Sequence, residues 1–175
     1  QRSLDDKHTP NLVFRNWIRF VNNALEMARA KQRLLTMSVR DEMTGAFNRR
    51  GMYIEVEKML EECSDGDNVF VCVIDMDRLK FINDNYGHHE GDFGIKTVSN
   101  AGFAVTGKDE IFVRAGGDEF YIIGVGDYSA ESGKDRIKEF NIAIQRLTDK
   151  ARKPYPITAS VGTALRKAEK NINLE

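Results

Sequence analysis

The stretch Arg114-Ala115-Gly116-Gly117-Asp118-Glu119-Phe120 places two glycines and then two carboxylates between two short apolar runs. These runs are residues 111–113 and 120–123, so the pattern predicts a β-hairpin with an acidic turn. Adjacent carboxylates repel each other, and glycines leave the backbone open to close approach by a ligand. We therefore expect a cation at this turn and further ligands for it elsewhere in the chain.

A second pair of carboxylates follows the most apolar run of the chain. Residues 69–74 are continuously apolar, which predicts a strand buried on both faces. Asp75 and Asp77 come directly after it, where a carboxylate is costly to desolvate without a cation or hydrogen-bond donors. Asp75 beside Asp118 and Glu119 would form an oxygen-rich site suited to Mg²⁺. The alternative is that Asp75 and Asp77 cap the next helix, and it stays open chiefly for Asp77.

Residues 78–92 are dense in side chains that suit a nucleotide. An amide donates and accepts hydrogen bonds and a carboxylate accepts them, so Asn and Asp side chains of this segment could together match the edge of a purine such as guanine. Lys80 would be a point-charge ligand for phosphate. Taken singly, these residues are more often caps or turn formers, and His88 with His89 would bind zinc only if further ligands lay nearby.

Composition limits the class of protein. The 175 residues are 41% hydrophobic and 30% charged, which suits one globular domain with an appendage. Residues 1–40 carry a net charge of +5 and residues 41–175 a net charge of −6, so the body of the chain is a poor surface for nucleic acid. Cys63 and Cys72 lack metal-ligand spacing and are expected to be reduced thiols.

The short length of the apolar runs predicts where the protein is located. No run approaches the roughly 20 residues needed to cross a bilayer, and no signal peptide is visible, so we expect a cytoplasmic protein without a membrane segment in this stretch. Because the chain begins at Gln1 without an initiator Met, we expect it to be a piece of a longer protein, which upstream segments could anchor to a membrane.

The N-terminal part, residues 1–40, is dominated by one predicted helix. Apolar residues recur in alternating steps of four and three, with one polar exception, at Phe14, Ile18, Val21, Leu25, Ala28, Gln32, Leu35 and Val39. This heptad spacing favours a two-stranded coiled coil, with Gln32 fixing the register. The alternative is an amphipathic helix that lies on its own domain.

The remaining elements predict an α+β fold. Residues 41–51 form a joint in which Arg49 and Arg50 are expected to hydrogen-bond carbonyls or carboxylates. Helices are predicted at 52–63, 91–105 and 130–151, and a last strand at 157–164. The core order strand, helix, helix, strand, strand, helix, strand (βααββαβ) indicates a mixed, largely antiparallel sheet flanked by helices. Carboxylates on a strand end and a neighbouring hairpin resemble the palm arrangement of two-metal nucleotidyl-transfer enzymes.

Several motifs in register resemble the diguanylate cyclase family, which is known by its GGDEF signature. Residues 116–120 match that signature in full. The other matches are Asp41-x-x-Thr44-Gly45-x-x-Asn48-Arg49-Arg50, Asp75-x-Asp77-x-x-Lys80-x-x-Asn83-Asp84-x-x-Gly87-His88-x-x-Gly91-Asp92 and Ser160-x-Gly162. The resemblance covers about residues 41–165, and several motifs in the right order are a specific signal.

The resemblance implies a reaction in bacterial second-messenger signalling. Family members condense two GTP molecules into cyclic di-GMP and release pyrophosphate, as each 3′-hydroxyl attacks the α-phosphate of the other GTP. One domain holds one GTP, so the resemblance implies a homodimer with facing half-sites, brought together by the N-terminal helix under an upstream sensor domain.

The resemblance also implies a role for each matching residue. Asp75, the Met76 carbonyl and Asp118 would hold Mg²⁺, with Mn²⁺ as the alternative ion, and Glu119 would assist. Asp118 would also accept a proton, which metal binding of the hydroxyl makes easier. The substrate and phosphate ligands implied are Asn83 and Asp92 for guanine, His88 for the nucleotide, Gly116 and Gly117 at the turn, and Lys80 for the phosphates.

Three departures from the family pattern qualify this expectation. Gly107 and Glu110 stand where many members carry an Arg-x-x-Asp product-inhibition site, so we expect no feedback of that kind. Leu79 stands where Phe is usual before the Lys. The family continues after the Ser160-x-Gly162 strand into a helix with further phosphate ligands, so residues 41–175 are expected to lack the C-terminal end of the domain.

Two other functions stay open at this point. The domain could be a catalytically idle module that binds GTP or a cyclic dinucleotide, or it could serve mainly as a dimerising signal relay. In the relay, the heptad seam would matter and Asp118 would not.

Overall fold

The computed structural model describes residues 9–169, with side chains described for residues 14–30 and 39–169. Contacts divide the chain into two compact units, residues 1–38 and residues 39–175. The predicted division after residue 40 lies two residues from this point. Across the described residues, no helix is both long enough and apolar enough to cross a membrane.

The first unit is made by helix α1 (Thr9–Val39), as the sequence predicts. Pro10 lies in the first turn, where its missing N–H group has no helical acceptor to lose. Three residues of the heptad seam, Phe14, Ile18 and Leu25, are 60%, 40% and 50% exposed. The side chains of Gln32 and Leu35 lie outside the described residues. Pairing of this seam with a second helix therefore stays a prediction.

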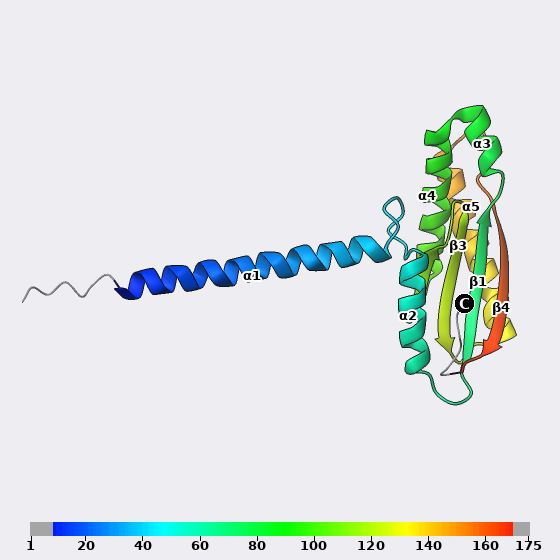
Figure 1. Cartoon of the computed structure of the whole chain (residues 1–175). Helices are drawn as coiled ribbons and strands as arrows, with labels where there is room; N and C mark the ends of the chain where they lie inside the picture. The colour runs from blue at the N-terminus through cyan, green and yellow to red at the C-terminus, as the bar shows by residue number, and fades with distance from the viewer. Residues whose placement is uncertain (1–8, 170–175) are drawn as a thin grey trace, which may run out of the picture. The chain divides into compact units, whose positions relative to one another are not determined.

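The second unit is a four-stranded sheet with helices, shown in Figure 1. Its strands are β1 (Asn68–Met76), β2 (Glu110–Arg114), β3 (Glu119–Gly126) and β4 (Ala159–Lys167), in the spatial order β2-β3-β1-β4. Its helices are α2 (Arg49–Glu61), α3 (Leu79–Tyr86), α4 (His88–Val105) and α5 (Ala130–Ala151).

The predicted α+β class and the βααββαβ order are confirmed. All three strand pairings among the described residues are antiparallel, and the one parallel pairing described there is the isolated bridge between Phe47 and Val113. The α5 limits are those predicted. α2 begins three residues earlier than predicted because Asn48 caps it, its Oδ1 accepting from Gly51 N at 2.9 Å.

Two hydrophobic clusters occupy the two faces of the sheet. The larger packs Phe70, Cys72, Ile74 and Met76 of β1 against residues of α4 and α5. The smaller packs α2 against the β2–β3 hairpin. Fully burying a large apolar side chain contributes about 1.5–3 kcal/mol, so the first cluster dominates the stability of the unit.

The prediction that residues 69–74 are buried on both faces is wrong. Burial alternates along β1, and Val73 is 39% exposed while Ile74 is fully buried. The physical reason is that α2 packs on β2 and β3 and leaves part of that face of β1 open. Both cysteines are free and buried, as expected of reduced thiols.

Candidate active site

The acidic turn and the end of β1 meet at one end of the sheet. Asp75 is the register partner of Glu119 in β3 and of Ser160 in β4. The backbone N–H of Met76 donates to the carbonyl of Asp118 at 3.1 Å. Because side chains alternate along a strand, Asp75 and Glu119 project from the face opposite the buried Ile74 and Met76. The structure therefore brings together the carboxylates that the sequence singled out.

These carboxylates destabilise each other. Burial raises the pKa of Asp75, and the negative charges of Asp118, Glu119 and Asp77 raise it further. A nearby cation would reverse that effect, because opposite charge favours the ionised carboxylate.

The described residues contain no group of three or more His, Cys, Asp or Glu side chains arranged to hold one metal ion. The expected set of three carboxylates around one ion is therefore not present in this arrangement. Mg²⁺ does not need such a set, because it is usually bound by one or two carboxylates together with water and substrate phosphates. Asp75, Asp118 and the Met76 carbonyl are oxygen donors of the kind that suit it.

Arg114 fixes the conformation of the glycine turn. Its Nε and Nη2 donate to the carbonyl of Gly117 at 3.2 and 2.7 Å. Its Nη1 donates to the Asp41 carboxylate at 3.0 and 3.2 Å, and Asp41 also accepts from the Thr44 backbone N–H at 2.9 Å. This link was not predicted from the sequence, where its one signal is an arginine two residues before the first glycine.

The expected role of Arg49 and Arg50 at the joint is wrong. Both side chains are exposed, and neither forms a hydrogen bond or ion pair with the described part of the chain. Arg40 instead donates to the carbonyl of Gly45 at 3.0 Å, and Arg114 binds Asp41. The physical reason is that α2 begins at Arg49, so both arginines lie in its first turn, where they line a cleft with residues 114–117.

Asp77 is not a helix cap. Its carboxylate accepts from the hydroxyl groups of Thr158 at 2.8 Å and Ser160 at 2.7 Å, both near the start of β4. The N-cap position of α3 belongs to Arg78, in the left-handed conformation with φ of 58°. Asp77 therefore ties the loop after β1 to β4.

The expected guanine-reading residues lie around the junction of α3 and α4. Gly87 separates the two helices at a φ of 88°, which favours glycine. A Cβ at Gly91 would collide with Oδ1 of Asn83, so glycine lets this carboxamide lie against the first turn of α4. Asp92 follows in the same turn. His88 and Lys80 are exposed and form no hydrogen bond or ion pair with the described residues.

An ion pair that the sequence did not predict holds the first turn of α4. Glu90 accepts from Lys153 Nζ at 2.9 Å and from the Tyr155 hydroxyl. Hydrogen bonds from Lys153 and Tyr155 lower the pKa of Glu90. Because Glu90 lies between His88 and Asp92, the segment after α5 positions the expected nucleotide ligands.

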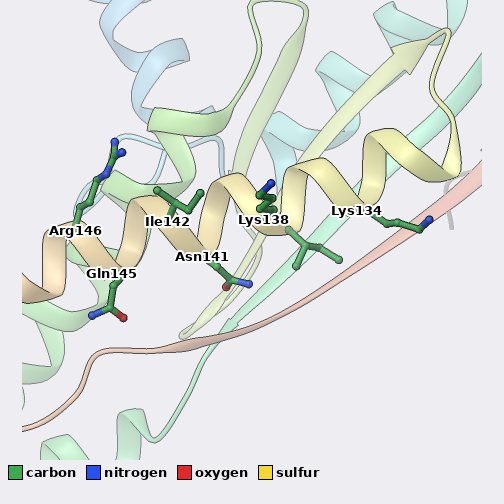
Figure 2. A pocket seen from close by; sticks show the side chains of 7 residues that line it. Lys134, Lys138, Asn141, Ile142, Gln145 and Arg146 are labelled. Atoms are coloured by element: carbon green, nitrogen blue, oxygen red, sulfur yellow. The ribbon is translucent and has the colours of Figure 1, made fainter.

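The described residues of this unit line a cleft and a larger depression. A cleft of about 450 Å³ is lined by Asp41, Asn48, Arg49, Arg50, Arg114, Ala115, Gly116 and Gly117. A larger, open depression of about 660 Å³ follows α5, where Lys134, Lys138, Asn141, Gln145 and Arg146 project from one helix (Figure 2). None of the residues that line this second depression is an expected site residue, whereas Gly116 and Gly117 of the signature turn line the first.

Comparison with known proteins identifies the family. The family described as "Diguanylate cyclase, GGDEF domain" matches residues 38–175. The chain belongs to the GGDEF domain family. Three relatives in Escherichia coli K12 are similar to parts of this GGDEF chain. They are the probable diguanylate cyclases DgcJ (40% identical over 96 residues, 54% of this chain) and DgcC (33% over 111 residues, 63%), and the cyclic di-GMP phosphodiesterase PdeR (35% over 98 residues, 56%).

The matches cover 19%, 30% and 15% of the lengths of DgcJ, DgcC and PdeR, so this GGDEF chain spans only a fraction of these relatives. Among solved structures, the coiled coil and GGDEF domain of DgcB from Caulobacter crescentus has a TM-score of 0.66 at 22% identity, covering 86% of this chain and 83% of that one. The GGDEF domain of PA1120 from Pseudomonas aeruginosa has a TM-score of 0.63 at 25% identity, covering 72% and 74%. These likenesses confirm the fold.

Proposed function

We propose that this GGDEF domain is a diguanylate cyclase that condenses two GTP molecules into cyclic di-GMP and pyrophosphate. The observation that carries the proposal is the meeting of Asp75 with the Asp118–Glu119 turn at one sheet end. Relatives named probable diguanylate cyclases support the same reaction. Family membership alone does not decide it, because PdeR in the same set is named a phosphodiesterase.

The metal ligands in this proposal are Asp75, Asp118 and the Met76 carbonyl, with Glu119 assisting. Mg²⁺, or Mn²⁺ in its place, would lower the pKa of the attacking 3′-hydroxyl and neutralise charge on the phosphates. Asp118 accepts the proton of that hydroxyl. The side chain of Met76 is buried, so the metal ligand that this residue supplies is its backbone carbonyl at the strand end.

The substrate ligands lie on the turn, α3 and α4. Asn83 and Asp92 bind the guanine edge by hydrogen bonds, and His88 contacts the nucleotide. Lys80 is exposed on α3 and offers its ammonium group to the phosphates. Gly116 and Gly117 allow the nucleotide to approach the backbone of the turn.

Each domain supplies half of the reaction site. Two domains must face each other so that each 3′-hydroxyl reaches the other α-phosphate. In this proposal, the apolar seam of α1 pairs with that of a second copy and places the two half-sites together under an upstream sensor domain.

A cyclase assay tests the proposal. The protein is incubated with GTP and Mg²⁺, and cyclic di-GMP is measured by chromatography. Asp118→Asn is expected to lower turnover by about 10³-fold or more, because it removes a transition-state charge contact. Asp127→Asn, an exposed acid beyond the far end of β3, is the matched control and should keep normal activity. Absence of product from the wild-type protein, or an unchanged rate in Asp118→Asn, would contradict the proposal.

A second candidate follows from the phosphodiesterase relatives. In it, the domain binds GTP or a cyclic dinucleotide without turnover and relays a signal through dimerisation. This candidate would be favoured if the protein binds nucleotide but forms no product, and if Asp118→Asn leaves the nucleotide binding unchanged.

A further inference from the structure

The cleft beside the glycine turn is a separate feature from the carboxylates. Its two walls are the first turn of α2, which supplies Arg49 and Arg50, and residues 114–117 of the hairpin. Asp75, Asp118 and Glu119 do not line it. Both walls belong to the second compact unit, so the described lining of the cleft lies within one domain.

The cleft has unused positive charge. Arg114 is neutralised by Asp41, whereas Arg49 and Arg50 form no ion pair with the described residues. The cleft thus keeps two free guanidinium groups, although residues 41–175 carry a net charge of −6. A guanidinium group that stays unpaired in a concave site is suited to a ligand with paired oxygen acceptors.

The backbone of the turn adds free donors. The amide N–H groups of Gly116 and Gly117 have no acceptor among the described residues, while the neighbouring Ala115 N–H donates to the carbonyl of Glu119 at 3.0 Å. Apart from Gly117 and its two chain neighbours, no described atom lies within 4 Å of the place where a Cβ of Gly117 would be, so the backbone there is open to a ligand. Successive free amides next to cationic side chains form an anion site.

We infer that this cleft binds a diphosphate group. Two free guanidinium groups and two free amides match two linked phosphoryl groups, and the volume of about 450 Å³ exceeds what one phosphate fills. Among the described residues, the lining contains no aromatic ring on which a base could stack, which argues against a whole nucleotide as the main ligand. The diphosphate is either free pyrophosphate or the diphosphate part of a GTP tail. A role for the cleft in holding the leaving pyrophosphate rests on the proposed cyclase function; the binding itself does not.

Calorimetry with inorganic pyrophosphate tests the inference. The whole protein is titrated at low ionic strength in the presence of a chelator, without GTP, so that no metal bridges the ligand to the carboxylates. Arg49→Gln and Arg50→Gln should each weaken binding by about tenfold, because each removes charge-assisted hydrogen bonds. Arg146→Gln, an exposed arginine on α5, should leave binding unchanged. In amide NMR spectra, pyrophosphate should shift the resonances of Gly116 and Gly117.

Each outcome decides the inference. If pyrophosphate binds and the binding depends on Arg49 and Arg50, the ligand of the cleft is the free anion. If only GTP binds in this arginine-dependent way, the ligand is the diphosphate part of the GTP tail. Undetectable binding of both ligands, equal binding in the Arg49→Gln/Arg50→Gln double variant, or equally tight binding of orthophosphate would overturn it. Arginine-dependent binding of cyclic di-GMP without pyrophosphate binding would also overturn it. The cyclase assay runs separately with Mg²⁺ and GTP, so failure here does not decide the proposed function.

Discussion

Arg114 connects two motifs that are far apart in the sequence. Its guanidinium group binds the Gly117 carbonyl on one side and the Asp41 carboxylate on the other, and it is 11% exposed. Burial raises the pKa of Asp41, but hydrogen bonds from Thr44 and Arg114 and the charge of Arg114 outweigh it and hold that pKa below its usual value. The turn that carries Asp118 is therefore anchored by a charged side chain and not by glycine conformation alone.

A double-mutant cycle tests this anchor. Arg114→Gln should lower the free energy of unfolding by about 2 kcal/mol at pH 7, because Asp41 then loses its partner while still partly buried. Asp41→Asn should have a similar effect, and the double variant should be less destabilised than the sum by about 1 kcal/mol. Urea denaturation measures all three. Strictly additive effects would show that the two side chains do not stabilise each other.

At the scale of elements, a buried ion pair joins β2 to α5. Glu110 accepts from Arg136 at 2.6 and 3.0 Å, from the Tyr128 hydroxyl at 3.0 Å and from the Gly107 N–H at 2.6 Å, with its side chain 3% exposed. Burial raises the pKa of Glu110, but the hydrogen bonds and the charge of Arg136 outweigh this, and the pKa is lowered. Glu110 is the residue where the family pattern often has the Asp of a product-inhibition site, and this pair leaves it little access to a ligand.

The pair predicts acid-sensitive stability. Because the pKa of Glu110 is lower when folded, its contribution is fully present above the unfolded value of about 4.3 and is lost as pH falls through the folded value. Glu110→Gln should cost about 3 kcal/mol at pH 7, since Arg136 loses its buried partner and keeps only the longer pair with the exposed Glu139 at 3.5 Å.

The cost of Glu110→Gln should shrink as pH falls below about 4, because the wild-type carboxylate also becomes neutral there. Denaturation curves at several pH values measure this change. Glu131→Gln, which breaks an exposed pair with Lys134, should cost under about 0.5 kcal/mol. If the loss of unfolding free energy caused by Glu110→Gln does not vary with pH, the titration of Glu110 does not contribute to stability.

At the scale of the whole molecule, α1 and the sheet domain are separate compact units. A helix of 31 residues with exposed Phe14, Ile18 and Leu25 on one seam leaves apolar surface in contact with water in the single chain. A second copy of the helix would remove that surface from water. Assembly and activity should therefore change together.

Leu25→Lys tests this coupling. The substitution puts a charge in the seam and should weaken dimerisation by about tenfold or more. In a wild-type cyclase, specific activity should rise with protein concentration, and the variant should need a higher concentration for the same activity. Met27→Lys, at an off-seam position that is 76% exposed, is the matched control. Sedimentation velocity gives the association state. Equal dimerisation of the two variants would contradict the proposal that the seam of α1 forms the dimer contact.

Local patterns predicted most of the fold. The limits of α5 follow from apolar residues at three- and four-residue steps that end shortly before Pro154, and the strands follow from short apolar runs. The partial exposure of Val73 could not be predicted, because it depends on where α2 lies on the sheet. The start of β4 was predicted two residues early, at Ile157, whereas the first ladder pair of β4 joins Ala159 to Met76.

The candidate site was predictable where its residues lie at strand ends or in the hairpin turn. Asp75 stands out directly after the apolar run 69–74, and Asp118 stands out between the apolar runs 111–113 and 120–123. The contacts between Arg114 and Asp41 and between Lys153 and Glu90 join residues 73 and 63 positions apart. Hydrophobic periodicity carries no information about such pairs, so the residues that support the site could not be found from the sequence.

The antiparallel pairing of β1 with β4 also sets an order of events during folding. The hydroxyl group of Ser160 is 83 residues from the Asp77 carboxylate that it binds, and such distant contacts form slowly. On a growing chain, the loop after β1 cannot be fixed in place until β4 has been synthesised and paired. We therefore expect the acidic end of the sheet to mature last, after the β2–β3 hairpin, whose strands are adjacent in sequence.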